Sequence, residues 1–533
     1  MKFAVLSDTH YVSKEMIPGD RDKRALLRHD INHSVFKMLA EQSELDTILI
    51  TGDLTDDGDY ASHSEFAAML RGLQEAGKKV YVLTATHDFH FSRAYTKKHG
   101  AQVKYKSEPW NVPWFDPSGF DFKSIVTDEF SDLPAEDCVP PIVKAATADD
   151  LWEIYHDFGP KQAFSVCESA YSYAVKIEDK LWCLMLNNNM RDVDAMMDYS
   201  ATYSPACYRW IESIMAQAKE QGAFVFACTH HPLVPPVPAY KIGGTTRNMR
   251  NSKSAHTLAD LGLSLVFSGH THFADIGFAS SDAGNVLCDV TTPALSFLPP
   301  AWRTVEIFPE EHRLWTVTVP VENTPELGVD TAELKEHFVN EFVGDYREKV
   351  QRLPHGLGKL VLNAEVRHLY PLCPKTLTDA EYREIKNVKM FDIIMDSVVN
   401  MQCGDGQYTP DTAVYKFMMG FAAAADSVID AQPFMDIRGK LLGYSCSEIV
   451  RPMLFNNYVP DNNADFIFDR LPEQNTELPE IKSHAGDILM ALLCAVGLLV
   501  APAGKILTAA AIPALTIMKK RRLAANPYHP ERY

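Results

Sequence analysis

Six short apolar runs in the first half of the chain constrain its fold most. They cover residues 2–6, 46–50, 79–84, 181–186, 223–228 and 263–267. Most are rich in β-branched or aromatic residues and end in polar residues, which is typical of buried strands. Helical patterns fill several of the gaps, for example at 24–42 and 60–76, where Gly77 suits the position just after a helix. This alternation predicts a layered α/β core.

Polar residues cluster where five of these runs end. The clusters are Asp8-Thr9-His10, Gly52-Asp53, Thr86-His87-Asp88, His230-His231 and His270-Thr271-His272. In layered α/β folds, functional groups gather on the loops at the carboxyl ends of strands. Histidine and carboxylate are ligands for divalent zinc, manganese and iron. There are more candidate ligands than one tetrahedral ion needs, so we expect two ions roughly 3.5–4 Å apart with a carboxylate between them.

The complete set of clusters resembles the pattern of the calcineurin-like metallophosphoesterases. That family carries Asp-x-His, Gly-Asp, Gly-Asn-His-Asp/Glu, a lone His and Gly-His-x-His in this order, and the chain matches it across roughly residues 1–320. Segments 158–165, 169–175 and 229–236 are also similar to bacterial phosphodiesterase-type members. The resemblance implies a four-layer α-β-β-α sandwich, here followed by a C-terminal helical accessory domain.

The resemblance also implies a ligand set for two divalent metal ions, which would be Mn, Fe or Zn. Asp8, His10 and His272 would bind the first ion, Asp53 would bridge both, and His230, His270 and the residue at position 86 would bind the second. His231 could equally replace His230, and we take His230 because the first histidine of such a pair is usually the ligand in the family.

The catalytic roles that the resemblance implies fall on Asp53, His87 and Asp88. His87 would contact the substrate phosphate or protonate the leaving group, with Asp88 orienting it. A metal-bound hydroxide, placed by the ions that share Asp53, would attack in line with the leaving oxygen. No covalent intermediate is needed.

The chain departs from the family pattern at Ala85-Thr86, where Gly-Asn is expected before His87. The family Asn ligates the second metal through its amide oxygen, and the Thr hydroxyl is a poorer neutral ligand. Ala85 would also remove the conformational freedom of a glycine at a tight turn. We therefore expect a tight first metal site and a weak second one.

Charge and cysteine content narrow the choice of partners and compartment. The formal net charge is −19, which argues against nucleic acid as the main partner because phosphate backbones are held by surplus Lys and Arg. Ten cysteines without a CxxC pair indicate neither a disulfide framework nor a thiolate zinc site. The opening MKFAVLSDTH lacks the pattern of a signal peptide, so we expect a cytoplasmic protein.

Changes in pattern along the chain predict three parts. Residues 1–322 form the catalytic domain, with a loop insertion at 101–150 rich in Pro and aromatic residues. Residues 323–480 form a helical accessory domain, in which Thr378–Glu381 has the form of a capping box and Pro410 would occupy a first helical position. Residues 481–533 form an apolar helical tail with a basic end.

The tail has two interpretations. Its apolar runs at 488–504 and 506–518 precede a Lys-Lys-Arg-Arg stretch at 519–522. A membrane span needs about 20 apolar residues, so the first run is borderline and the second is short. The two runs could be core helices of the accessory domain. They could also give peripheral membrane contact through 488–522, as a re-entrant hairpin or as interfacial helices.

The leading functional interpretation is a hydrolase of small phosphoric esters, most simply a phosphodiesterase. A pyrophosphatase or phosphatase acting on a lipid-linked substrate at the membrane surface is the second, because of the apolar tail. The third is a non-catalytic member that binds a metal or ligand, because of Thr86. Asn187, Asn188 and Asn189 follow a predicted strand and could line the cleft or only form a turn.

Overall fold

The first sheet is built around the N-terminal strand. In the computed structural model, β1 pairs in parallel with β2 and antiparallel with β13. Among the described residues this sheet has six strands in the order β17-β14-β13-β1-β2-β3. Their bounds are β1 (Lys2–Leu6), β2 (Thr47–Ile50), β3 (Lys79–Val82), β13 (Ala301–Phe308), β14 (Arg313–Pro320) and β17 (Asn463–Ile467).

The structure describes most of the chain. The described residues are 1–16, 23–56, 58–89, 95–98, 101–104, 146–188, 202–235, 252–324, 328–352, 361–404, 408–430, 445, 447, 450–451, 454 and 461–472.

The second sheet lies against the first. Its described strands follow the order β11-β12-β10-β9-β8-β7-β6. They are β6 (Ser165–Cys167), β7 (Ser172–Glu178), β8 (Leu181–Leu186), β9 (Phe224–Thr229), β10 (Leu265–Ser268), β11 (Asp275–Ser280) and β12 (Val286–Thr291). All six predicted apolar runs are strands, shifted by at most two residues at either end.

Alternating side chains of β1 show how the layers form, because successive residues of a strand face opposite sides. Phe3 and Val5 pack between the two sheets, against Phe226 and Phe267 of the second sheet. Ala4 and Leu6 face the helices on the other side of the first sheet.

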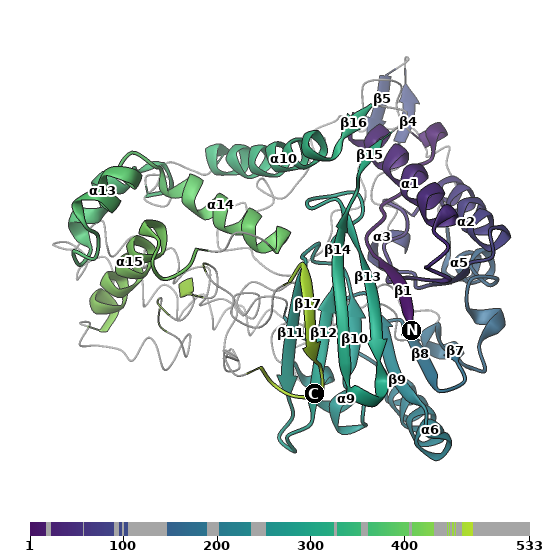
Figure 1. Ribbon diagram of the computed structural model, residues 1–533. Coiled ribbons are helices and arrows are strands. Elements are labelled where there is room, and N and C mark those ends of the chain that lie inside the picture. Colours follow the sequence, from purple (N-terminus) through teal and green to yellow (C-terminus); the bar gives the residue numbers. More distant parts are fainter. Residues whose placement is uncertain are drawn as a thin grey trace, which may run out of the picture.

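Helices cover both outer faces and complete the predicted α-β-β-α sandwich, as Figure 1 shows. The first sheet is covered by α1 (Lys23–Glu41), α2 (Tyr60–Glu75) and α5 (Ala148–Ile154). The second is covered by α6 (Pro205–Gln221) and α9 (Lys253–Asp260). Polar side chains cap the N-termini of two of these helices. The carboxylate of Asp59 accepts a hydrogen bond from Ser62 N at the start of α2, and Ser204 does the same for Cys207 N in α6.

The region after β14 is mostly helical. It contains β15 (Asn323–Thr324), β16 (Val329–Asp330), α10 (Thr331–Arg352), α12 (Val366–Leu369), α13 (Asp379–Ile385), α14 (Met390–Cys403) and α15 (Ala413–Asp430). Helices α12 to α15 share a small apolar core of their own. The Thr378 capping box is present.

The start of α15 differs from the prediction that Pro410 begins a helix. The helix begins at Ala413. The hydroxyl of Thr412 accepts a hydrogen bond from Tyr415 N at 3.3 Å, so this later residue caps the first turn.

One strand inside the region assigned to the helical part belongs to the catalytic core. β17 pairs antiparallel with β14, with Ala464 opposite Thr316. Figure 1 shows it beside β14 at the edge of the first sheet. The chain therefore leaves the first sheet after β14 and returns to it about 150 residues later, as the Arg313–Asp465 pair shows with a separation of 152 residues. The division into domains otherwise stays a prediction.

Two predicted segments lie largely or wholly outside the described residues. Of the insertion at 101–150, the structure describes only 101–104 and 146–150. β5 (Ala101–Lys104) forms a hairpin with β4 (Tyr95–Lys98). The tail at 481–533 is entirely outside. Among the helices that the structure does describe, none is both long enough and apolar enough to cross a membrane.

Candidate metal centre

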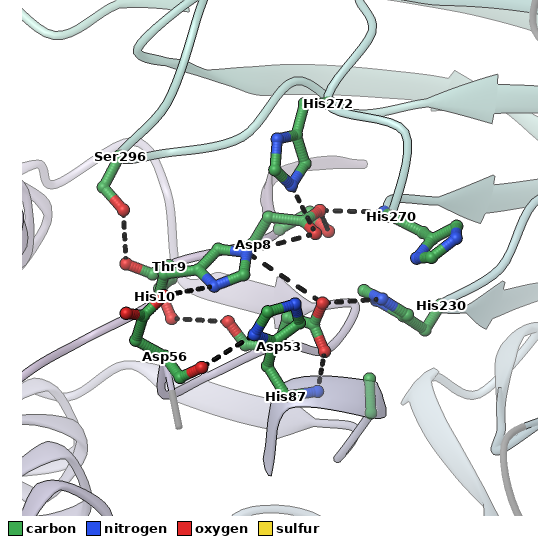
Figure 2. Close-up of polar contacts among 12 residues, drawn as sticks. Asp8, Thr9, His10, Asp53, Asp56, His87, His230, His270, His272 and Ser296 are labelled. Atoms are coloured by element: carbon green, nitrogen blue, oxygen red, sulfur yellow. Dashed lines mark hydrogen bonds and ion pairs between the residues drawn. The ribbon is translucent and has the colours of Figure 1, made fainter. Parts of the chain in front are cut away.

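Five loops at strand ends converge on one point between the two sheets. Those after β1, β2 and β3 come from neighbouring parallel strands of the first sheet. Those after β9 and β10 come from parallel strands of the second. Figure 2 shows Asp8, His10, Asp53, His87, His230, His270 and His272 facing one another there. The carboxyl-end clustering expected from the sequence is therefore present.

One set of candidate ligands consists of Asp8, His10 and His272, whose ligand atoms lie within 4.8 Å of one another. Asp8 Oδ1 is 3.3 Å from His272 Nε2 and 3.8 Å from His10 Nε2. The other carboxylate oxygen, Oδ2, accepts hydrogen bonds from Ser7 Oγ and His270 N. These two bonds fix the carboxylate and leave Oδ1 directed at the histidines.

A second set consists of Asp53, His230 and His270. Asp53 Oδ2 lies 3.1 Å from His230 Nε2 and 3.9 Å from His10 Nε2. His230 Nδ1 is 3.1 Å from the carbonyl oxygen of Thr51, which can only accept, so Nδ1 carries the proton and Nε2 is available as a ligand. Asp53 thus stands between the two sets.

The electrostatics of the centre fit a pair of cations. Burial would raise the pKa of Asp8 and Asp53, but the surrounding histidines hold both well below the usual range. Burial would lower the pKa of His10 and His230, but the neighbouring carboxylates raise these to about 9 and about 8.

Within the described part of the chain, several buried ligand atoms also lack a hydrogen-bond partner, among them Asp8 Oδ1, His10 Nε2 and His230 Nε2. Buried polar atoms are normally satisfied, and bound divalent ions would satisfy these.

The backbone is strained where it presents the ligands. Left-handed φ values are uncommon for residues other than glycine, and such strain gathers at functional sites. The ligand residues with positive φ are Asp8 (50°), His10 (41°), Asp53 (49°), His270 (65°) and His272 (61°). The tight packing of the loops holds these residues in place.

Gly52 shows how tight that packing is. Its φ is +114°, and a Cβ placed on it would lie 2.6 Å from Ala85 Cβ and 2.8 Å from His230 Nδ1. Only glycine allows the loops after β2, β3 and β9 to approach this closely.

Thr86 lies at the start of α3 (Thr86–Phe89) beside these loops. It is buried, and none of the residues that the structure describes forms a hydrogen bond with its Oγ1. Ala85 is not among the residues with positive φ, so the expectation that it loses a needed glycine conformation is wrong. The turn at this position is one that alanine adopts without strain.

His87 and Asp88 do not form the pair that we expected. His87 is exposed, and its Nδ1 lies 2.7 Å from the carbonyl oxygen of Asp56. The buried carboxylate of Asp88 instead accepts hydrogen bonds from Thr55 N and Ala85 N. Asp88 therefore ties together the loops after β2 and β3, and the backbone of Asp56 orients the imidazole.

Three residues near the centre were missed from the sequence. Asp56 Oδ1 lies 3.2 Å from His10 Nδ1, and Asp56 Oδ2 lies 2.7 Å from Arg28 Nη1. The Arg28 guanidinium also sits 4.2 Å from the centroid of the Phe297 ring. The short spacing from Asp53 could have singled out Asp56. Arg28 and Phe297 lie in a helix and a loop far from the motifs, with no local signal.

Phe297 contacts two of the candidate ligands. Its ring stacks on His272, with centroids 4.8 Å apart, and meets His10 edge-on at 4.7 Å. It thus fixes the planes of two imidazoles of the first set.

His231 is buried beside the centre but belongs to none of the described ligand groups. It packs with Asn188, whose Nδ2 donates to His231 O and whose Oδ1 accepts from His231 N. Asn187 donates to Thr84 O. Both asparagines are buried and brace neighbouring loops. Asn189 lies outside the described residues.

The profile of the calcineurin-like phosphoesterase family matches residues 1–274, which is half of the chain. The chain belongs to this family. Two solved structures are similar to the phosphoesterase at low identity. A dimetal phosphatase from Danio rerio is 10% identical with a TM-score of 0.34, over 60% of this chain and 96% of that one. A purple acid phosphatase from yellow lupin is 11% identical with a TM-score of 0.34, over 60% of this chain and 51% of that one. No curated protein is significantly similar in sequence.

Family membership and the paired ligand sets together make the phosphoesterase a metal-dependent hydrolase of phosphoric esters. Two divalent ions, of the Mn, Fe or Zn type, are its cofactors.

Proposed function

We propose that the phosphoesterase is a phosphodiesterase acting on a small diester. The observation that carries this proposal is the arrangement of positive charge. Arg28 is a cationic side chain at the edge of the centre, and its charge helps to hold the pKa of the buried Asp56 below its usual range. Its guanidinium is already paired with Asp56.

A phosphate monoester approaches two negative charges near neutral pH, because its second pKa is about 6. A diester carries one. A centre whose nearby arginine is committed to a carboxylate suits the single charge better. The similarity of segments 158–165, 169–175 and 229–236 to phosphodiesterase-type members supports the same choice.

The ligand roles form part of the proposal. Asp8, His10 and His272 hold the first ion, Asp53 is shared, and His230 and His270 hold the second with a weak contribution from Thr86. When bound, two such ions lower the pKa of a coordinated water and neutralise phosphoryl charge.

His87 is the proposed group that acts on the substrate. Its Nδ1 faces a carbonyl oxygen 2.7 Å away, which can only accept, so the proton lies on Nδ1 and Nε2 remains for the substrate side. From this exposed position it contacts the phosphate or, when protonated, donates to the leaving oxygen. Asp88 acts through the backbone by holding the loop that carries His87.

The test is hydrolysis of bis(p-nitrophenyl) phosphate and p-nitrophenyl phosphate by metal-stripped protein to which manganese is returned. We expect the diester to be the better substrate, with activity that requires metal and is lost in Asp53→Ala. Preference for the monoester would refute the diester assignment but keep the family chemistry.

Turnover of neither ester by metal-loaded protein would favour one of the two other interpretations. A lipid-linked pyrophosphate substrate would then be tested with detergent-solubilised lipid phosphates. The apolar stretch 488–522 that motivates it lies outside the described residues.

A further inference from the structure

The C-terminal end of α14 contacts the back of the metal centre, although α14 lies more than a hundred residues beyond the part of the chain that matches the family. The contact is made by Gln402, which is 5% exposed. The last carbonyls of a helix have no partner within it. Gln402 O is one of these, and it accepts a hydrogen bond from Ala274 N at 3.0 Å.

The side chain of the same residue reaches a second loop. Gln402 Nε2 donates to Leu298 O at 2.6 Å. Gln402 therefore joins two loops that come from different strands of the catalytic domain.

One of these loops carries His272 of the first ligand set, and the other carries Phe297, which contacts two members of that set. Ala274 follows His272 by two residues, and Leu298 directly follows Phe297. Since Phe297 stacks on His272 and meets His10 edge-on, the two bonds of Gln402 hold that stacked pair from behind.

The helix end has little freedom to shift. α14 is closed by Gly404 in the left-handed conformation. A Cβ on Gly404 would lie 2.8 Å from Ala274 O and 2.9 Å from Asp461 Cβ. Asn462, next to β17, donates to Cys403 O at 2.9 Å. The junction is thus packed on several sides.

We propose that Gln402 is a positioning residue of the first metal site, through which the helical region sets the geometry of His272 and Phe297. This inference rests on the proposed ligand roles of Asp8, His10 and His272. The helical region would then help to position a metal ligand, in addition to packing against the catalytic domain.

The test is titration of Mn²⁺ into metal-stripped full-length protein by calorimetry. Gln402→Met keeps the volume and the backbone bond but removes the donor to Leu298 O. Partners behind metal ligands typically contribute 10–100-fold to affinity, so we expect the tighter binding event to weaken by about tenfold. The weaker event and the far-UV circular dichroism should stay as in the wild type.

Ser397→Ala is the matched control. Ser397 is equally buried in α14, and its hydroxyl donates to Ile393 O within the same helix. This variant should lower stability without changing the metal affinity. If Gln402→Met does not fold, Gln402→Asn is used, because it keeps the amide but is one methylene too short to reach Leu298 O.

Phe297→Leu tests the same chain of contacts from the other end. This variant should weaken the tighter Mn²⁺ binding event by a similar factor. In the double variant with Gln402→Met, the loss of binding free energy should be smaller than the sum of the two single losses. A folded Gln402 variant that titrates like the wild type would overturn the inference.

Measurements on the wild type test the proposed function, and measurements on the Gln402 variants test this inference. If the wild type binds no metal, the ligand roles themselves are wrong, and if it binds metal but hydrolyses neither ester, only the diester assignment fails. If the wild type binds two ions and is active while the Gln402 variants bind equally well, only the positioning role is lost.

Discussion

Thr86 stands where the family pattern has Asn, and we propose that its shorter hydroxyl contributes only weakly to the second ligand set. It directly follows Ala85, and its buried Oγ1 has no hydrogen-bond partner among the described residues. Thr86→Asn should therefore tighten the weaker of two Mn²⁺ binding events, by about tenfold if one good ligand is gained. Calorimetric titration of wild type and variant checks this. Two equally tight sites in the wild type would contradict it.

Asp56 connects two histidines of the centre with one cation. Its carboxylate faces His10 and Arg28, and its carbonyl oxygen faces His87. Burial would raise the pKa of Asp56, but Arg28 and His10 hold it well below its usual range, so it is ionised at neutral pH. Asp56→Asn should lower first-site metal affinity by about 10–100-fold.

The companion variant for Asp56→Asn is Arg28→Met. It leaves the contact between Asp56 and His10 in place, and it should lower the affinity less. Metal titration of both variants separates the two partners. A larger loss in Arg28→Met would mean that the arginine itself orients the centre.

At the scale of elements, α2 stabilises the loops behind the centre through a buried histidine. His63 Nδ1 lies 2.8 Å from Tyr155 Oη, and Nε2 lies 3.0 Å from Asp88 O. Burial lowers the pKa of His63 to about 4. The folded protein therefore keeps this ring neutral, while the unfolded chain protonates it near its ordinary value of about 6.5.

The unfolded state binds more protons between these two values, so stability is present above pH 6.5 and is lost as the pH falls toward 4. Protonation of His63 alone lowers the free energy of unfolding by an amount that approaches about 3 kcal/mol. We expect His63→Gln, in metal-free protein, to remove that part of the pH dependence. Urea unfolding at pH 7 and pH 4.5 measures it. Equal pH slopes in wild type and variant would contradict the assignment.

At the scale of the whole molecule, β17 and the residues that follow it pack into the core of the catalytic sheets. Phe468 is fully buried in the core between the sheets, 5.5 Å from the Phe224 ring. Phe468→Ala should cost about 3–5 kcal/mol. Leu471→Ala, at a site 38% exposed, should cost far less. Urea unfolding followed by tryptophan fluorescence compares them, and equal midpoints would show that this strand is not part of the core.

The sequence was informative where local pattern and function coincide. Asp8, Asp53 and His272 lie within five residues of the ends of apolar runs, so the layers, the strand ends and the clustering of ligands there could be predicted. Gln402 and β17 could not, because their partners lie more than a hundred residues away and a short segment does not specify a distant contact. Asp88 was misjudged because its neighbour His87 is close in sequence while its hydrogen-bond partners are backbone groups of other residues.

The return of β17 to β14 has a consequence for synthesis of the chain. Until residues near 463–467 leave the ribosome, β14 presents an unpaired edge. At about 5–20 residues per second, the intervening stretch of some 150 residues takes roughly 8–30 s to translate. A nascent chain at that stage has an open strand edge and an uncovered side chain at Phe224. We expect this interval to be when the protein depends most on chaperones, and expression at lower temperature or with added holdases to raise the soluble yield.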